Sequence, residues 1–251
     1  MGHLTLLTYF PFFENEYANE FMTTALWYVV PIFLLAAILI TIRVFVKIPD
    51  FIFRKILHLV AIFMMGPLIA IPIHWWLAEI ILGISGIGII VILLMFEHWS
   101  FYQKLFIEKG RHEVLVSFIM FFTVMISLVA FFWGYRGDAH KYYILIAVLA
   151  WGVGDAAASI VGHLVGKHKL TGKLIEGVKS VEGTIACFVF SFAISIILLT
   201  LLIRYTWWVA LIESILIGIV VSLAELFTKK GMDNVTCPLT AGVILFLFSL
   251  I

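Results

Sequence analysis

One acidic side chain, Asp155, lies within an otherwise apolar stretch of the chain. An ionisable group inside a segment long enough to cross a membrane is costly and is by default a functional candidate. On a helix, Asp155, Ser159, Gly162 and Gly166 would share one face. That face is small and polar, so another backbone or a ligand can approach it closely. Ordinary packing of small residues between helices is the alternative, and it explains the glycines but not the carboxylate.

A basic segment follows and ends in Lys179 and Ser180, just before the next apolar stretch. Free backbone N–H groups and the helix dipole make a helix N-terminus suitable for phosphate, and an ammonium and a hydroxyl would add to that. Glu182, in the predicted first turn, can hold a metal ion or simply favour the dipole. The alternative is a solvated basic loop in which Ser180 caps the helix and the lysines meet lipid head groups.

A third polar element begins an apolar stretch earlier in the chain. Arg54 and His58 are one helical turn apart on one face, with Lys55 beside them. These side chains can contact a phosphate or a head group. The alternative is anchoring at the membrane surface, with His58 as a packing residue.

A fourth element, Asp233 and Asn234, follows the seventh apolar stretch, which carries Glu225 near its end. Carboxylate and amide oxygens are hard ligands that suit Mg²⁺. A simple turn is the alternative, because Asp and Asn are common turn residues. Arg111 and Glu113, before the fourth apolar stretch, are weaker candidates of the same kind.

The composition indicates an integral membrane protein. Hydrophobic residues make up 64% of the chain, charged residues 12%, and the mean hydropathy is +1.17, against about 45–50% apolar residues in soluble domains. A net charge of +1 gives no sign of nucleic acid binding. Cys187 and Cys237 form no CxxC pair and have no histidine at ligand spacing, so neither a zinc site nor a disulfide framework is predicted.

The predicted fold is all-α, a polytopic transmembrane helix bundle forming one domain over residues 1–251. A bilayer core needs about 20 apolar residues per helix, which gives about seven or eight spans. The N-terminal 20 residues carry three glutamates and no Lys or Arg, so they do not form a secretory signal. The predicted spans are 21–42, 56–73, 77–96, 114–133, 142–164, 184–203, 207–226 and a short last one at 237–251.

The basic residues are distributed unevenly between the linkers. Alternate linkers hold 13 of the 16 Lys and Arg residues. The positive-inside rule therefore places these linkers in the cytoplasm and the N-terminus outside. All four polar elements then lie at cytoplasmic ends of spans, which predicts one functional face.

Taken in order, the four elements resemble the signature of the CTP-dependent lipid kinases of the polyprenol kinase type: the dolichol kinases, phytol kinases and CTP-dependent diacylglycerol kinases. The resemblance covers residues 54–238. It is carried by Arg54-Lys55-xx-His58, by Gly154-Asp155 with Ala158, Gly162 and Gly166, by Lys179-Ser180-x-Glu182-Gly183, and by Asp233-Asn234-xxx-Pro238.

Two departures are visible. The family often has Gly-Glu before the fourth span, where this chain has His112-Glu113. The chain is also distantly similar to the CDP-diacylglycerol synthases, which usually carry Ser-Pro-Lys-Lys-Thr where this chain has Gly177-Val-Lys-Ser-Val.

The resemblance implies a membrane kinase that transfers the γ-phosphoryl group of CTP, with Mg²⁺, to the hydroxyl of a lipid alcohol such as a polyprenol or dolichol, a phytol-like isoprenoid or diacylglycerol. Such a transfer needs alignment and charge neutralisation. The implied catalytic residues are Asp155, Lys179 and Glu182, and the implied metal ligands are Asp155, Glu182 and Asp233. The implied phosphate- and nucleotide-binding residues are Arg54, Lys55, His58, Lys179, Ser180, Gly183, Thr184 and Asn234.

Three other functions remain open. A CTP:phosphatidate cytidylyltransferase would make a CDP-lipid from the same nucleotide. An ion-coupled transporter would use Asp155 as an ion or proton site, although inverted repeats are not visible. A non-catalytic scaffold would leave the grouping of polar elements on one face unexplained.

Overall fold

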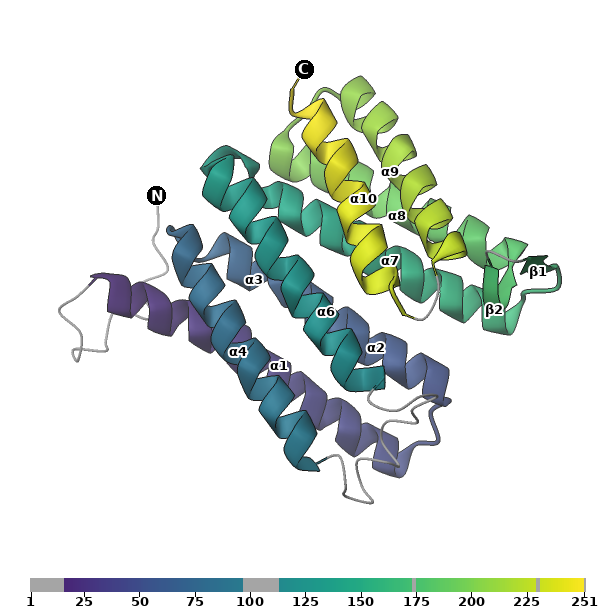
Figure 1. The fold of residues 1–251 in the computed structure, drawn as a ribbon, viewed down its shortest axis with the longest axis horizontal. Coiled ribbons are helices and arrows are strands. Elements are labelled where there is room, and N and C mark those ends of the chain that lie inside the picture. Colours follow the sequence, from purple (N-terminus) through teal and green to yellow (C-terminus); the bar gives the residue numbers. More distant parts are fainter. Residues whose placement is uncertain (1–15, 97–112, 173–174, 229–230, 251) are drawn as a thin grey trace.

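The computed structural model describes residues 16–96, 113–172, 175–228 and 231–250 (Figure 1). Helices account for nearly all of this part of the chain, which confirms the all-α prediction. In order, the α-helices are α1 (Glu16–Phe45), α2 (Asp50–Phe63), α3 (Met65–Ala70), α4 (Trp75–Phe96), α6 (Glu113–Leu128), α7 (Lys141–Leu164), α8 (Val181–Leu198), α9 (Trp207–Phe227) and α10 (Asp233–Phe248). The π-helical turns η1 (Val129–Tyr135) and η3 (Leu199–Ile203) extend α6 and α8, and a 3-10 turn, η2 (Asp138–His140), precedes α7.

Within the described residues, seven helical segments are long and apolar enough to cross a membrane. They correspond to the first seven predicted spans, with α2 and α3 together forming the second. The predicted eighth span differs, because α10 begins at Asp233 rather than at residue 237 and is shorter than the other seven. Asp233 and Asn234 therefore lie in the first turn of a helix and not in a separate turn.

Helix α7 is the centre of the bundle. In an 18-residue apolar stretch of the α7 segment, 78% of the residues are buried inside the protein. In the matching stretch of α1, 6% of the residues are buried. Helix α7 contacts α2, α8, α9 and α10, and Figure 1 shows α1 and α4 on the opposite side of the molecule from α8 and α9. Asp155 is therefore carried by the helix most enclosed by protein, whereas α1 presents most of its surface outward.

Small residues let α7 and α8 approach closely. A Cβ atom added to Gly154 would lie 2.1 Å from the Ser191 hydroxyl oxygen, and one added to Gly183 would lie 2.8 Å from the backbone oxygen of Ala158. The Ser191 hydroxyl also donates to the Ala150 carbonyl at 2.8 Å. The two helices are thus in near-backbone contact on both sides of Asp155.

The basic segment before α8 is a β-hairpin rather than an open loop. Strands β1 (Lys169–Gly172) and β2 (Ile175–Ser180) pair antiparallel, with Leu170 opposite Lys179. Successive side chains of a strand point to opposite faces. The side chains of Lys179 and Ser180 consequently point in opposite directions and contact different neighbours.

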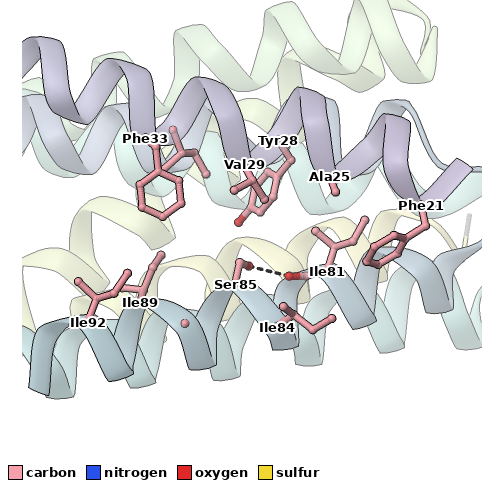
Figure 2. Close-up of a pocket in the computed structure, with 12 residues that line it drawn as sticks. Phe21, Ala25, Tyr28, Val29, Phe33, Ile81, Ile84, Ser85, Ile89 and Ile92 are labelled. Carbon is pink, nitrogen blue, oxygen red and sulfur yellow. Dashed lines mark hydrogen bonds between the residues drawn. The ribbon is translucent and has the colours of Figure 1, made fainter. Parts of the chain in front are cut away.

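At the other side of the bundle, a carboxylate of α1 is bound to the turn that precedes α4. Glu20 accepts hydrogen bonds from the backbone N–H groups of Ile73 and His74, at 2.7 and 2.9 Å, and contacts the His74 ring at 2.9 Å. Between α1 and α4 lies an apolar pocket of about 230 Å³, lined by Tyr28 and Ser85 among others (Figure 2).

Candidate functional site

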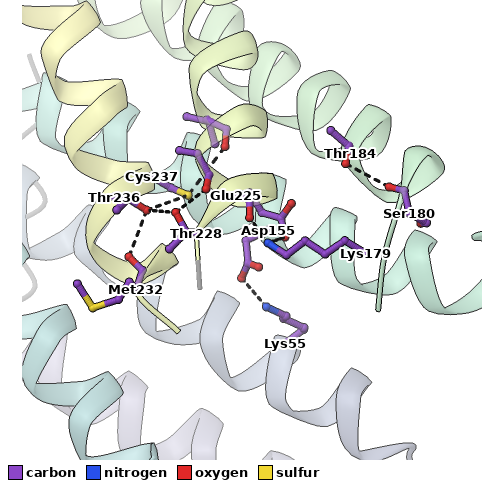
Figure 3. Close-up of polar contacts among 12 residues, drawn as sticks. Lys55, Asp155, Lys179, Ser180, Thr184, Glu225, Thr228, Met232, Thr236 and Cys237 are labelled. Carbon is purple, nitrogen blue, oxygen red and sulfur yellow. Dashed lines mark hydrogen bonds and ion pairs between the residues drawn. The ribbon is translucent and has the colours of Figure 1, made fainter. Parts of the chain in front are cut away.

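The Asp155 carboxylate is held by two basic side chains of α2. Lys55 Nζ lies 2.5 Å from Asp155 Oδ2 (Figure 3). His58 Nε2 lies 3.6 Å from the same oxygen. The Asp155 side chain is only 7% exposed. His58 Nε2 is buried and has no hydrogen-bond partner among the described residues. The pair is therefore a charged contact inside the bundle with one unsatisfied ring nitrogen beside it.

Lys55 takes part in this contact, whereas Arg54 does not. Lys55 and His58 are three residues apart and so share a face of α2, which packs against α7. Arg54 is exposed. The residue that reaches Asp155 is therefore Lys55, and phosphate binding by Arg54, Lys55 and His58 stays a prediction.

A second ion pair joins the hairpin to α9. Lys179 Nζ lies 3.0 Å from the Glu225 carboxylate and also donates to the backbone carbonyl of Glu225 (Figure 3). Both side chains are largely buried. Glu225 was noticed in the sequence as a carboxylate near the end of an apolar stretch, but it was given no role. Its partner comes from a segment 46 residues away in the chain, so no local spacing could have revealed the pair.

Asp233 completes the acidic side of this cluster. From the first turn of α10 it lies close enough to Asp155, Lys55 and Glu225 to interact with them electrostatically. Five charged side chains therefore gather from α2, α7, β2, α9 and α10, namely three carboxylates and two ammonium groups. We call Lys55, Asp155, Lys179, Glu225 and Asp233 the charged cluster.

Glu182 takes a different position from the one expected. Its carboxylate contacts the His168 ring at 2.7 Å and accepts from the His168 backbone N–H at 3.2 Å. In the part of the chain that the structure describes, no three His, Cys, Asp or Glu side chains are arranged to hold a metal ion. The expected joint ligand set of Asp155, Glu182 and Asp233 is therefore not assembled, because Glu182 is turned toward the loop that precedes β1.

Ser180 acts as the N-cap of α8. Its buried hydroxyl accepts from the Gly183 backbone N–H at 3.1 Å, and Thr184 donates to the Ser180 carbonyl at 3.1 Å. Its side chain fills the space beside two glycines, since a Cβ atom on Gly166 would lie 2.6 Å from the Ser180 hydroxyl oxygen and one on Gly162 would lie 3.2 Å from it. The capping alternative for Ser180 is thus observed, while phosphate binding by Ser180, Gly183 and Thr184 stays a prediction.

The helix bounds also locate the remaining candidate residues. Helix α7 ends at Leu164, so Gly166 lies beyond it and does not extend the face of Asp155 and Ser159. Asn234 sits beside Asp233 in the first turn of α10. Glu113 is the first residue of α6, and Arg111 lies outside the described residues.

Comparisons with known proteins agree with the resemblance carried by the motifs. The chain is 27% identical over 199 residues to a phytol kinase from Synechocystis sp., covering 76% of each protein. It is also 27% identical over 159 residues to a dolichol kinase from Schizosaccharomyces pombe, covering 58% of this chain and 29% of that longer protein. No family model matches the chain, and no solved structure matches it. Both relatives carry names of lipid kinases, which supports the family resemblance predicted from the sequence.

Proposed function

From its similarity to lipid kinases, we propose that this membrane protein transfers the γ-phosphoryl group of CTP to the hydroxyl of a lipid alcohol. The observation that carries the proposal is the position of Asp155, buried on the central helix with Lys55 at 2.5 Å. A carboxylate and ammonium groups gathered at one end of an apolar bundle suit a reaction between a charged nucleotide and a greasy alcohol. The lipid tail would stay in the bilayer while its hydroxyl reaches the charged cluster.

In the proposed reaction, the alcohol oxygen forms a bond to the γ-phosphorus as the bond from that phosphorus to the β-phosphate oxygen breaks. The alcohol proton passes to Asp155, and CDP leaves. Phosphoryl transfer depends mainly on positioning and charge stabilisation. Lys55 and Lys179 would compensate the phosphate charge, and the unpartnered Nε2 of His58 can bond a phosphate oxygen or the incoming hydroxyl.

Magnesium is part of the proposal as a companion of the nucleotide. Mg²⁺ is usually held by one or two carboxylates together with substrate phosphates. Asp155 and Asp233, which lie within electrostatic range of each other, would supply those carboxylates. When bound, the ion would neutralise charge on the phosphates. These two carboxylates replace the larger ligand set that included Glu182. For Glu182 we propose instead that it orients the hairpin through its contact with His168.

The acceptor classes that fit are polyprenols including dolichol, phytol-like isoprenoids and diacylglycerol. The positive-inside distribution of Lys and Arg supports a cytoplasmic position for the charged cluster. CTP made in the cytosol would then meet the alcohol at the membrane surface.

The test uses the full-length protein in lipid vesicles with radiolabelled nucleotides and a panel of these alcohols. Wild-type protein is expected to form a lipid phosphate plus CDP, and Asp155→Asn is expected to lose at least about 100-fold in rate, as expected for a positioned acid–base group. The matched control is Asp50→Asn, because Asp50 is an exposed carboxylate near the start of α2. Phosphoryl transfer at the wild-type rate in Asp155→Asn would contradict the catalytic assignment of Asp155. A CDP-lipid plus pyrophosphate would instead identify a cytidylyltransferase, and solute flux without nucleotide turnover would identify a transporter.

A further inference from the structure

A stacked aromatic pair lies at the rim of the charged cluster and has no part in the mechanism above. The rings of Phe51, in the first turn of α2, and His163, in the last turn of α7, are parallel within 11° with centroids 4.4 Å apart. Phe51 is half-buried and His163 is exposed. One face of the His163 ring is thus covered by Phe51, and the ring as a whole reaches the surface.

The pair continues the line of contacts between α2 and α7 that holds Asp155. Along this line, Trp151 packs edge-on against His58, Asp155 pairs with Lys55, and His163 stacks on Phe51. The three contacts pass from buried Trp151 and Asp155 to exposed His163. The line therefore leads from the reacting groups outward to the surface at the hairpin end of the bundle.

The separation along α7 matches the dimensions of a nucleotide. Eight residues from Asp155 to His163 correspond to two helical turns, or about 12 Å. That distance is comparable to the span from the terminal phosphate to the base in an extended nucleoside triphosphate. A nucleotide with its γ-phosphate at Lys55 and Asp155 would bring its base to the aromatic pair, with exposed Arg54 between them on the surface of α2.

A hydrogen bond to the preceding turn of α7 fixes the orientation of the His163 ring. Its Nδ1 lies 2.7 Å from the carbonyl oxygen of Ser159. Because a carbonyl oxygen only accepts, Nδ1 must carry the proton and donate. The remaining ring nitrogen, Nε2, points away from that bond. A ring that is held by one hydrogen bond and backed by one aromatic neighbour is a rigid surface for stacking.

We propose that the His163 ring, backed by Phe51, is the platform on which the base of the nucleotide donor stacks. The proposal rests on the proposed function, since it assumes that phosphates bind at the charged cluster. Stacking of a base on an aromatic side chain tolerates different bases, because every base has a π-face. His163 is accordingly a residue that binds the donor. It does not select cytosine over other bases.

The experiment measures steady-state kinetics of full-length His163→Ala in vesicles, with CTP and a lipid alcohol each varied in turn. The KM for CTP is expected to rise by about 5- to 100-fold, the effect of losing one base–aromatic stack. The kcat and the KM for the alcohol are expected to stay within about twofold, because uniform binding of the donor is what is lost. His163→Phe should restore the KM for CTP, since it keeps the ring and removes the nitrogens.

The matched control is Leu164→Ala, which removes an exposed side chain from the same turn. A KM for CTP that is unchanged in His163→Ala, while Asp155→Asn is inactive, would overturn the base platform and leave the proposed function intact. An equal rise in His163→Ala and His163→Phe would also overturn it, by indicating that the bond to Ser159 matters and not the ring. If His163→Ala fails to fold, two other variants test the proposal. The KM for CTP is expected to be unchanged in His163→Phe and raised in Phe51→Leu. Wild-type protein that neither binds nor turns over CTP would overturn both proposals together.

Discussion

Two regions of the bundle bury carboxylates in opposite ways. In the charged cluster, Asp155 and Glu225 each contact a lysine. In the first third of α9, Glu213 is completely buried, and neither carboxylate oxygen has a hydrogen-bond partner among the described residues. The buried hydroxyls of Ser214, the next residue of α9, and of Ser195, in α8, likewise have no hydrogen-bond partner among the described residues.

The difference shows where this chain can keep charge inside the bundle. An isolated ionised carboxylate in apolar surroundings costs so much free energy that it takes up a proton instead. Because no described cation contacts Glu213, we expect it to be in that neutral form. Asp155 and Glu225 have lysines that come from other segments. Contact with a lysine therefore marks the region proposed to react, and the presence of a buried carboxylate alone does not.

The largest expected effect comes from removing one member of a charged pair. Lys55→Met leaves Asp155 without its cation, which should lower the free energy of unfolding by about 3 kcal/mol and abolish phosphoryl transfer. Thermal unfolding in detergent and the vesicle assay measure the two effects. The double variant Lys55→Met/Asp155→Leu should regain most of the stability but none of the activity. Arg54→Met is the control for stability, because Arg54 is exposed at the adjacent position of α2. An equal loss in the free energy of unfolding in Arg54→Met would contradict the assignment of the Lys55–Asp155 pair.

An intermediate effect is expected where the backbones that support the charged cluster meet. Gly183→Ala would place a Cβ atom 2.8 Å from the backbone oxygen of Ala158. Because a backbone cannot move aside as a side-chain end can, the free energy of unfolding should fall by about 1–3 kcal/mol. Gly83→Ala, in α4, meets nothing within 4 Å and should be neutral or slightly stabilising. Comparable losses in both variants would show that the contact between α7 and α8 is not the cause.

The smallest effect is expected at Glu213. Glu213→Gln replaces a neutral carboxyl by a neutral amide of similar shape, so the free energy of unfolding should change by less than about 1 kcal/mol. Thermal unfolding at several pH values checks this. A loss as large as that of Lys55→Met would remove the contrast between the two regions, because it would mean that Glu213 is charged and has a partner.

Much of the fold could be predicted from the sequence because a membrane imposes a simple length rule. Seven apolar stretches reappear as seven helical segments of sufficient length. The positions of Asp155, Lys179 and Asp233 at one end of the bundle also agree with the motif analysis. Helix length and hydropathy act locally, so residues near one another in the chain are enough to reveal them.

Contacts between distant segments could not be predicted in the same way. Choosing between Arg54 and Lys55 required knowing which face of α2 meets α7. The partners of Glu225 and Glu182 depend on the β-hairpin, whose short strands give a weak local pattern within a basic segment. These side chains are long and flexible, and their partners are selected only once several helices have packed together.

The place of Ser180 between two glycines has a consequence for how such sequences can diverge. The hydroxyl that caps α8 occupies the space into which side chains at positions 162 and 166 would extend. Two signature elements that are separate in the chain therefore meet in one contact. Among distant relatives, a larger residue at position 162 should occur together with a smaller one at the serine position, so these two positions should covary. At position 166 the backbone oxygen of Gly162, 2.3 Å from an added Cβ atom, also excludes a side chain, so glycine should persist there.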